Sequence, residues 1–239
     1  MRKIVTLSSI LSCFVVFMGC AQNKVDDKAN QLKDKLLSTI GGKDIWKNAG
    51  AIKVELIGHY VIEEVPWREK FWLDYEKPRG KYEIKSETTD RLIAWTTQNG
   101  WELKDGNFEY QEASRHKVEM EYYHSEPTVV FHKIAKDDSD IILGIDSTDS
   151  ALRKLVVMDK ITKDTLCTIG VNLKSEPIYW STKLGDRKIE RVLGPLQDFG
   201  DDVRLFSWGA SPDGKWRYEH ISISLLESVP DQITFDPPQ

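Results

Sequence analysis

The sequence predicts a mainly β protein: a single antiparallel sheet with an N-terminal amphipathic helix and a short internal helix. Three observations carry this prediction. Apolar residues recur every three or four positions over residues 25–40, they alternate with polar residues after residue 51, and Gly-containing turn sequences separate the alternating runs. No linker rich in Pro, Gly or Ser interrupts the 239 residues, so we expect one folded domain over residues 25–239.

The N-terminal helix is predicted from its apolar face, which comprises Val25, Ala29, Leu32, Leu36, Leu37 and Ile40. Gly41 and Gly42 end this pattern, as glycines commonly do after a helix. The following "KDIWKN" supplies one more helical turn, with Ile45 and Trp46 as its apolar residues.

Strands are predicted where the apolar period is two. Residues 52–56 alternate in this way, and "RLIAWTTQNGWELKDG" reads as a hairpin because Asn99-Gly100 tolerates the positive φ angles of a tight turn. In residues 216–225 the apolar positions change from even to odd numbers, which predicts a β-bulge near His220. Residues 112–124 lack alternation and are predicted as the short internal helix.

No sequence pattern indicates an enzyme, a cofactor or a metal site. GxSxG, HExxH, P-loop and GxGxxG sequences are absent. His116, His124 and His132 recur every eight residues, but we assign them to a helix, a proline turn and a strand, where they would not converge on a metal. Asp198 and Asp201 could serve a hydrolase as an acid–base pair, although surface turn acids are the favoured interpretation. The formal net charge of −5 argues against nucleic-acid binding.

The N-terminus has the pattern of a secretory signal. Arg2 and Lys3 precede an apolar run over residues 4–18, which would span about 22 Å as a helix and so falls short of a ~30 Å hydrocarbon core. The run ends in "FMGC", which resembles the lipobox of bacterial lipoproteins. The resemblance implies that residues 1–19 are a signal peptide, that Cys20 is acylated with palmitate-type chains, and that residues 20–24 tether the domain.

Two alternatives for Cys20 are a plain signal peptide with a chance cysteine and an uncleaved anchor, and the short apolar run disfavours the second. Ala21 is not the aspartate typical of inner-membrane retention, so we expect an outer-membrane anchor in a bacterial envelope and leave the membrane face open. Acylation at Cys20 would leave Cys167 without a disulfide partner, and we predict it as a small buried apolar residue.

Three segments together resemble the lipoprotein-carrier (LolA/LolB-like) superfamily: "STIGGKDIWKNAGAIKVELIG", "NGWELKDG" and the closing "ISISLLESVPDQITFDPP". The resemblance covers roughly residues 24–238. It implies that the sheet curls into an unclosed half-barrel whose concave side is covered by helices and holds acyl chains or other hydrophobic ligands. It carries over no catalytic residue, since the carrier members have none.

We therefore expect a membrane-anchored lipoprotein that binds a lipid or acyl chain in a concave cavity. Eight tryptophans are many for this length, and strand parity nominates four of them as ligand contacts: Trp72, Trp95, Trp101 and Trp180. The alternative is a structural or interaction lipoprotein that docks an envelope protein or a glycan and has no ligand cavity.

Overall fold

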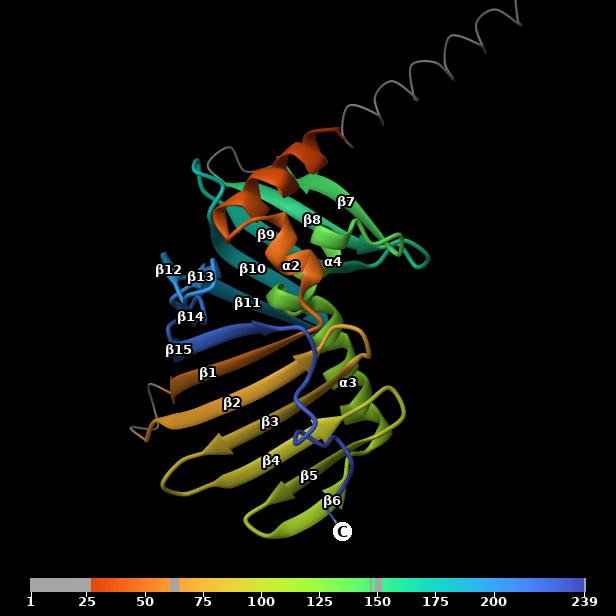
Figure 1. Ribbon diagram of the computed structural model, residues 1–239, viewed down its shortest axis with the longest axis vertical. Helices are drawn as coiled ribbons and strands as arrows, with labels where there is room; N and C mark the ends of the chain where they lie inside the picture. The colour runs from red at the N-terminus through yellow and green to blue at the C-terminus, as the bar shows by residue number, and fades with distance from the viewer. Residues whose placement is uncertain (1–26, 61–64, 147, 149–151, 239) are drawn as a thin grey trace, which may run out of the picture.

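The computed structural model describes residues 27–60, 65–146, 148 and 152–238. The predicted signal peptide, Cys20 and the tether lie outside these residues. Within them, strands dominate, and thirteen strands form one antiparallel sheet in the order β6-β5-β4-β3-β2-β1-β15-β14-β11-β10-β9-β8-β7 (Figure 1). The two ends of this order, β6 and β7, are not paired with each other, so the sheet is not closed into a barrel. This confirms the predicted fold class.

The chain forms the sheet as two meanders. The strands of the first are β1 (Ala51–Tyr60), β2 (Trp67–Asp74), β3 (Arg79–Lys85), β4 (Asp90–Trp95), β5 (Gly100–Lys104) and β6 (Asn107–Tyr110). Those of the second are β7 (Ile141–Asp146), β8 (Arg153–Asp159), β9 (Thr165–Val171), β10 (Pro177–Leu184), β11 (Arg187–Leu193), β14 (Trp208–Ala210) and β15 (Trp216–Leu226). A separate hairpin comprises β12 (Leu196–Asp198) and β13 (Arg204–Phe206).

The strands that come first and last in the chain, β1 and β15, pair with each other at the centre of the sheet. β15 runs antiparallel to β1 from Ala51 opposite Leu226 to Tyr60 opposite Trp216. The register shifts beside Leu56, which lies opposite His220, and this confirms the bulge predicted near His220. Because the bulge changes the parity of β15, Tyr218 and His220 lie on the same face as Leu56 rather than on the opposite face.

The helices cover one face of this sheet. Residues 27–39 are helical, as predicted, and α2 (Lys43–Asn48) follows the two glycines. α3 (Ala113–Ser125) confirms the internal helix. Trp95 of β4 meets Tyr123 of α3 with ring centroids 5.3 Å apart, so the inner face of the first meander packs on this helix.

One helix contradicts the sequence-based assignment. We predicted a strand around His132, but α4 (Pro127–Lys136) is helical and places His132 in its interior. Val129, Val130 and Phe131 have high β propensity, which misled the prediction. Burial outweighs that propensity: most of α4 is enclosed, and Phe131 packs edge-on against Trp46 with centroids 5.4 Å apart.

The C-terminal segment covers part of the other face. Trp101 donates its Nε1–H to the Phe235 carbonyl at 2.8 Å, and the Arg79 guanidinium lies 4.3 Å from the Phe235 ring centroid. In Figure 1 this segment crosses the first meander from β15 toward β6. Trp101 is thereby only 1 % exposed although it lies on the face away from the helices.

Cys167 is buried, as predicted, and within the described part of the chain it forms no disulfide. In the part of the chain that the structure describes, no helix combines the length and the apolar character needed to cross a bilayer.

Candidate functional site

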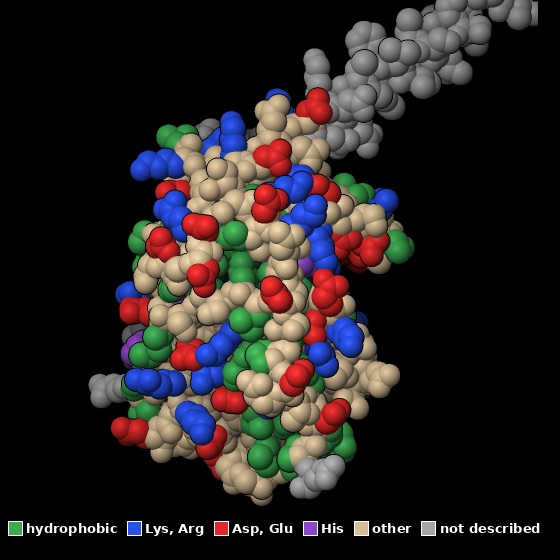
Figure 2. Space-filling model, viewed as in Figure 1, with side chains coloured by type: hydrophobic (Ala, Val, Ile, Leu, Met, Phe, Trp, Pro, Cys, Tyr) green, Lys and Arg blue, Asp and Glu red, His purple; other side chains and the backbone are tan. Residues whose placement is uncertain are grey.

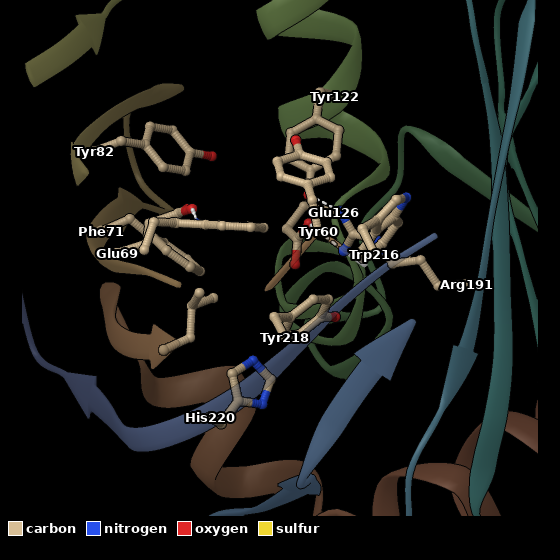
Figure 3. Close-up of a pocket in the computed structure, with 12 residues that line it drawn as sticks. Tyr60, Glu69, Phe71, Tyr82, Tyr122, Glu126, Arg191, Trp216, Tyr218 and His220 are labelled. Carbon is tan, nitrogen blue, oxygen red and sulfur yellow. Dashed lines mark hydrogen bonds and ion pairs between the residues drawn. The ribbon is translucent and has the colours of Figure 1, made fainter. Parts of the chain in front are cut away.

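A cavity of about 240 Å³ lies on the helix-covered face, where the central strands pass beneath α3 (Figure 3). Apolar and aromatic side chains form most of its wall: Leu56, Tyr60, Trp67, Phe71, Tyr82, Tyr122, Trp216 and Tyr218. Four polar residues complete it: Glu69, Glu126, Arg191 and His220. A mainly apolar cavity with a few convergent polar groups is the usual form of a small-molecule site.

Strand register explains why these residues meet. Leu56 of β1 lies directly between Glu69 of β2 and His220 of β15, and Phe71 lies opposite Tyr82 of β3. Gly58 leaves the room that Trp67 needs, because a Cβ at Gly58 would lie 2.0 Å from the Trp67 ring. The indole is therefore free to lie across β1 toward Tyr60, with ring centroids 4.8 Å apart.

Arg191 of β11 is the central charged residue of the cavity wall. Its Nη1 lies 3.6 Å from Oε2 of the buried Glu126 at the start of α4, and its Nη2 donates to the Tyr122 hydroxyl. The guanidinium is also enclosed by aromatic rings, with centroid distances of 4.7 Å to Trp180, 5.5 Å to Tyr218 and 5.7 Å to Trp216. Such contacts stabilise a desolvated cation.

Burial and neighbouring charge set the ionisation of these groups. Although burial opposes its charge, Tyr122, Tyr218 and Glu126 hold the pKa of Arg191 well above its usual value, so Arg191 stays cationic. Burial raises the pKa of Glu126, and the nearby Arg191 opposes that rise. Arg191 and Glu126 thus form a buried ion pair in which each charge depends on the other.

Glu69 differs from Glu126 in its surroundings. It is half-buried, and its Oε2 accepts a long hydrogen bond of 3.4 Å from Trp67 Nε1. Burial raises the pKa of Glu69 to about 7, and the hydrogen bond from Trp67 and the charge of Arg191 only partly offset this rise. His220 stays neutral at pH 7, since burial lowers its pKa to about 4 while its Nδ1 lies 2.8 Å from the Phe206 carbonyl oxygen.

The four tryptophans nominated from strand parity do not line this cavity. Strand pairing places Trp72 in one row with Ala94 and Trp101, on the face away from the helices. Trp95 and Trp180 are fully buried on the helix side, and Trp180 donates its Nε1–H to the Ser125 carbonyl at 2.9 Å. Trp180 contacts the site only indirectly, by packing against the Arg191 guanidinium. Ligand contact by any of the four tryptophans stays a prediction.

Glu69 and Arg191 were not predicted as site residues, although the sequence contains a signal for both. Each is a charged residue within an otherwise apolar row of alternating positions: Glu69 precedes Phe71 and Leu73, and Arg191 lies between Ile189 and Leu193. A charge on the apolar face of a strand is costly unless the fold pairs it or uses it.

The other residues considered from the sequence lie apart. His116 and His132 each bond a different backbone carbonyl, those of Thr96 and Trp46. Asp198 and Asp201 are exposed in the β12–β13 hairpin. Among residues 27–60, 65–146, 148 and 152–238, no three His, Cys, Asp or Glu side chains gather as a set of metal ligands.

No protein-family model matches the chain, and no curated protein matches its sequence. Solved structures with a similar arrangement include a LolA superfamily protein from Nitrosomonas europaea, at 10% identity and a TM-score of 0.48 over 87% of this chain and 96% of that one. A DUF1329 family protein from Desulfovibrio piger has 10% identity and a TM-score of 0.47 over 84% of this chain and 93% of that one. The likeness concerns the arrangement of the chain and assigns no function.

Proposed function

We propose that the protein is a membrane-anchored envelope lipoprotein that binds a hydrophobic ligand in the cavity between the central strands and α3. The observation that carries this proposal is the cavity itself, whose wall is mainly aromatic and whose few polar groups converge from β2, β11, β15 and the start of α4. Burial of apolar ligand surface supplies the affinity, and the polar groups orient the ligand. The cavity favours this function over docking without a ligand.

The size of the cavity limits what it encloses. At about 240 Å³ it lies below the range of roughly 300–1,000 Å³ that is usual for drug-sized ligands. It therefore fits one small organic group or the end of one chain, while the rest of a longer ligand would extend out of the opening.

Filling the cavity should weaken ligand retention. Leu56→Trp places a larger side chain in the cavity, and its overlap with a bound ligand should weaken binding by about tenfold, or about 1.4 kcal/mol. Native mass spectrometry of protein purified from an envelope-targeted expression measures the retained ligand.

Ile221→Trp is the matched control, because Ile221 is 48 % exposed on β15 and does not line the cavity. This variant should retain the ligand mass seen with the unaltered protein. A clean apo mass for the unaltered protein, together with no binding of added amphiphiles, would contradict the proposal and favour a docking lipoprotein.

The anchor is proposed from the sequence alone. Cys20→Ala should remove palmitate labelling and move the protein from the outer-membrane fraction to the soluble fraction, because stable anchoring needs the acyl chains of a modified cysteine. Cys13→Ala is the control, since Cys13 lies inside the predicted signal peptide and should leave labelling unchanged. Palmitate labelling of the Cys20→Ala protein equal to that of the unaltered protein would contradict acylation at Cys20.

A further inference from the structure

The charges of the cavity wall are distributed unequally between its two sides. In Figure 3, Arg191 lies with Trp216 on one side of the cavity and Glu69 lies with Phe71 and Tyr82 on the other. On the first side the charges of Arg191 and Glu126 compensate each other. Among the residues that the structure describes, Glu69 on the second side is the charge of the cavity wall without a paired opposite charge.

The charged end of Arg191 is largely engaged by the protein. Its Nη2 donates to the Tyr122 hydroxyl and its Nη1 lies 3.6 Å from Glu126 Oε2, while its Nε is buried and has no hydrogen-bond partner among the described residues. The rings of Trp180 and Tyr218 enclose the guanidinium as well. An anionic ligand would therefore have to displace Glu126 from a buried ion pair, at the cost of leaving that carboxylate unpaired.

Glu69 is available to a ligand. It lines the cavity and is half-buried, while Arg191 and Arg91 act on it only through space. Aromatic faces surround it: Trp67 donates the long hydrogen bond, and Phe71 and Tyr82 pack with centroids 5.3 Å apart. A carboxylate beside aromatic faces is the arrangement that binds ammonium groups, because the ring quadrupole and the carboxylate both attract a cation.

We propose that the cavity binds the cationic group of its ligand, an amine or a quaternary ammonium on an apolar chain, at Glu69 among the rings of Trp67, Phe71 and Tyr82. This inference rests on the proposed function and names the ligand chemistry of the same cavity. The cation comes either from a lipid headgroup or from a free organic cation, and both present the same group to Glu69.

The pH dependence of binding follows from Glu69. The other titratable or charged groups that line the cavity or act on Glu69 are Tyr60, Tyr82, Arg91, Tyr122, Glu126, Arg191, Tyr218 and His220. Arg191 stays charged and His220 stays neutral near pH 7, and the charge of Arg191 opposes the rise that burial imposes on the pKa of Glu126, so we assign the change near pH 7 to Glu69. Burial raises its pKa to about 7, so affinity for a cation should rise as the pH increases from 5.5 to 8 and Glu69 loses its proton.

The test compares decyltrimethylammonium, decanol and decanoate, which share one chain length and carry a positive, a neutral and a negative group. Isothermal titration calorimetry of the purified protein below micelle concentrations should show decyltrimethylammonium binding about tenfold more tightly than decanol at pH 8. This preference should fall at pH 5.5 and disappear in Glu69→Gln, which keeps the shape of the side chain and removes its charge. Glu219→Gln, at an exposed position of the same sheet, should keep it.

Equal affinity for the cation and decanol at pH 8, or tightest binding of decanoate, would overturn the cation site while leaving the hydrophobic cavity intact. No binding of any of the three would overturn the proposed function as well. Tetramethylammonium separates the two sources: binding of this headgroup alone supports recognition of a free cation, and binding only of the chain-bearing cation supports a lipid headgroup. The pH profile of the unaltered protein provides the same test if Glu69→Gln does not fold.

Discussion

Arg191→Met should lower the free energy of unfolding by about 3–5 kcal/mol, because removing one partner of a buried ion pair leaves the other charge uncompensated. Arg191 and Glu126 have side chains that are 13 % and 8 % exposed, so water cannot take over the lost interaction. The rings of Trp180 and Tyr218 would also lose the cation that they enclose. Urea denaturation followed by tryptophan fluorescence measures the change.

The pH dependence of this loss identifies its cause. Burial raises the pKa of Glu126, and without Arg191 the opposing influence is gone. A carboxyl group whose pKa is higher in the folded state favours folding less as the pH rises above its unfolded value. The destabilisation should therefore be larger at pH 8 than at pH 5, where Glu126 can hold a proton.

Arg217→Met provides the matched control. Arg217 also lies over a tryptophan, 5.0 Å from the Trp208 ring centroid, and pairs with Glu219 at 2.7 Å, but its side chain is 50 % exposed. An exposed pair of this kind contributes at most about 1 kcal/mol. Arg191→Met combined with Glu126→Gln should recover part of the loss, since the orphaned charge is removed. A loss for Arg191→Met no larger than that for Arg217→Met would contradict the structural role of the ion pair.

Trp180→Ala should have an effect of similar size, about 3–5 kcal/mol, because it leaves a cavity in the packed core. The Trp180 side chain is fully buried, donates to the Ser125 carbonyl at the end of α3, and lies 4.7 Å from the Arg191 guanidinium. The substitution therefore removes packing, a buried hydrogen bond and one wall of the Arg191 enclosure together. Thermal and urea denaturation measure the loss.

Trp180→Phe separates these contributions. It keeps an aromatic ring beside Arg191 but leaves the Ser125 carbonyl without its donor, so we expect an intermediate loss. Trp208→Ala, at a partly exposed tryptophan in β14, should cost less than either. Equal losses of unfolding free energy for Trp180→Ala and Trp208→Ala would contradict a core role for Trp180. Its predicted role in ligand contact would then be the one to test.

The sequence alone determined the elements that depend on local pattern. The helix over residues 27–39, the β4–β5 hairpin and the bulge in β15 follow from periodicity and turn chemistry, which act between residues close together in the chain. The helix α4 could not be predicted in this way. Its β-branched and aromatic run favours a strand, and enclosure against Trp46 together with Pro127 at its first position favours the helix.

The tertiary structure alone decided where the candidate site lies. Parity within a strand shows which residues share a face, but not which face of one strand matches which face of another, and strand register settles this. Register places Trp72 and Trp101 on the face away from the helices and Trp95 on the helix-covered face. Glu69 and Arg191 meet at one cavity because the pairing of β1 with β15 joins the two meanders. No local pattern encodes this pairing, because the two strands lie at opposite ends of the chain.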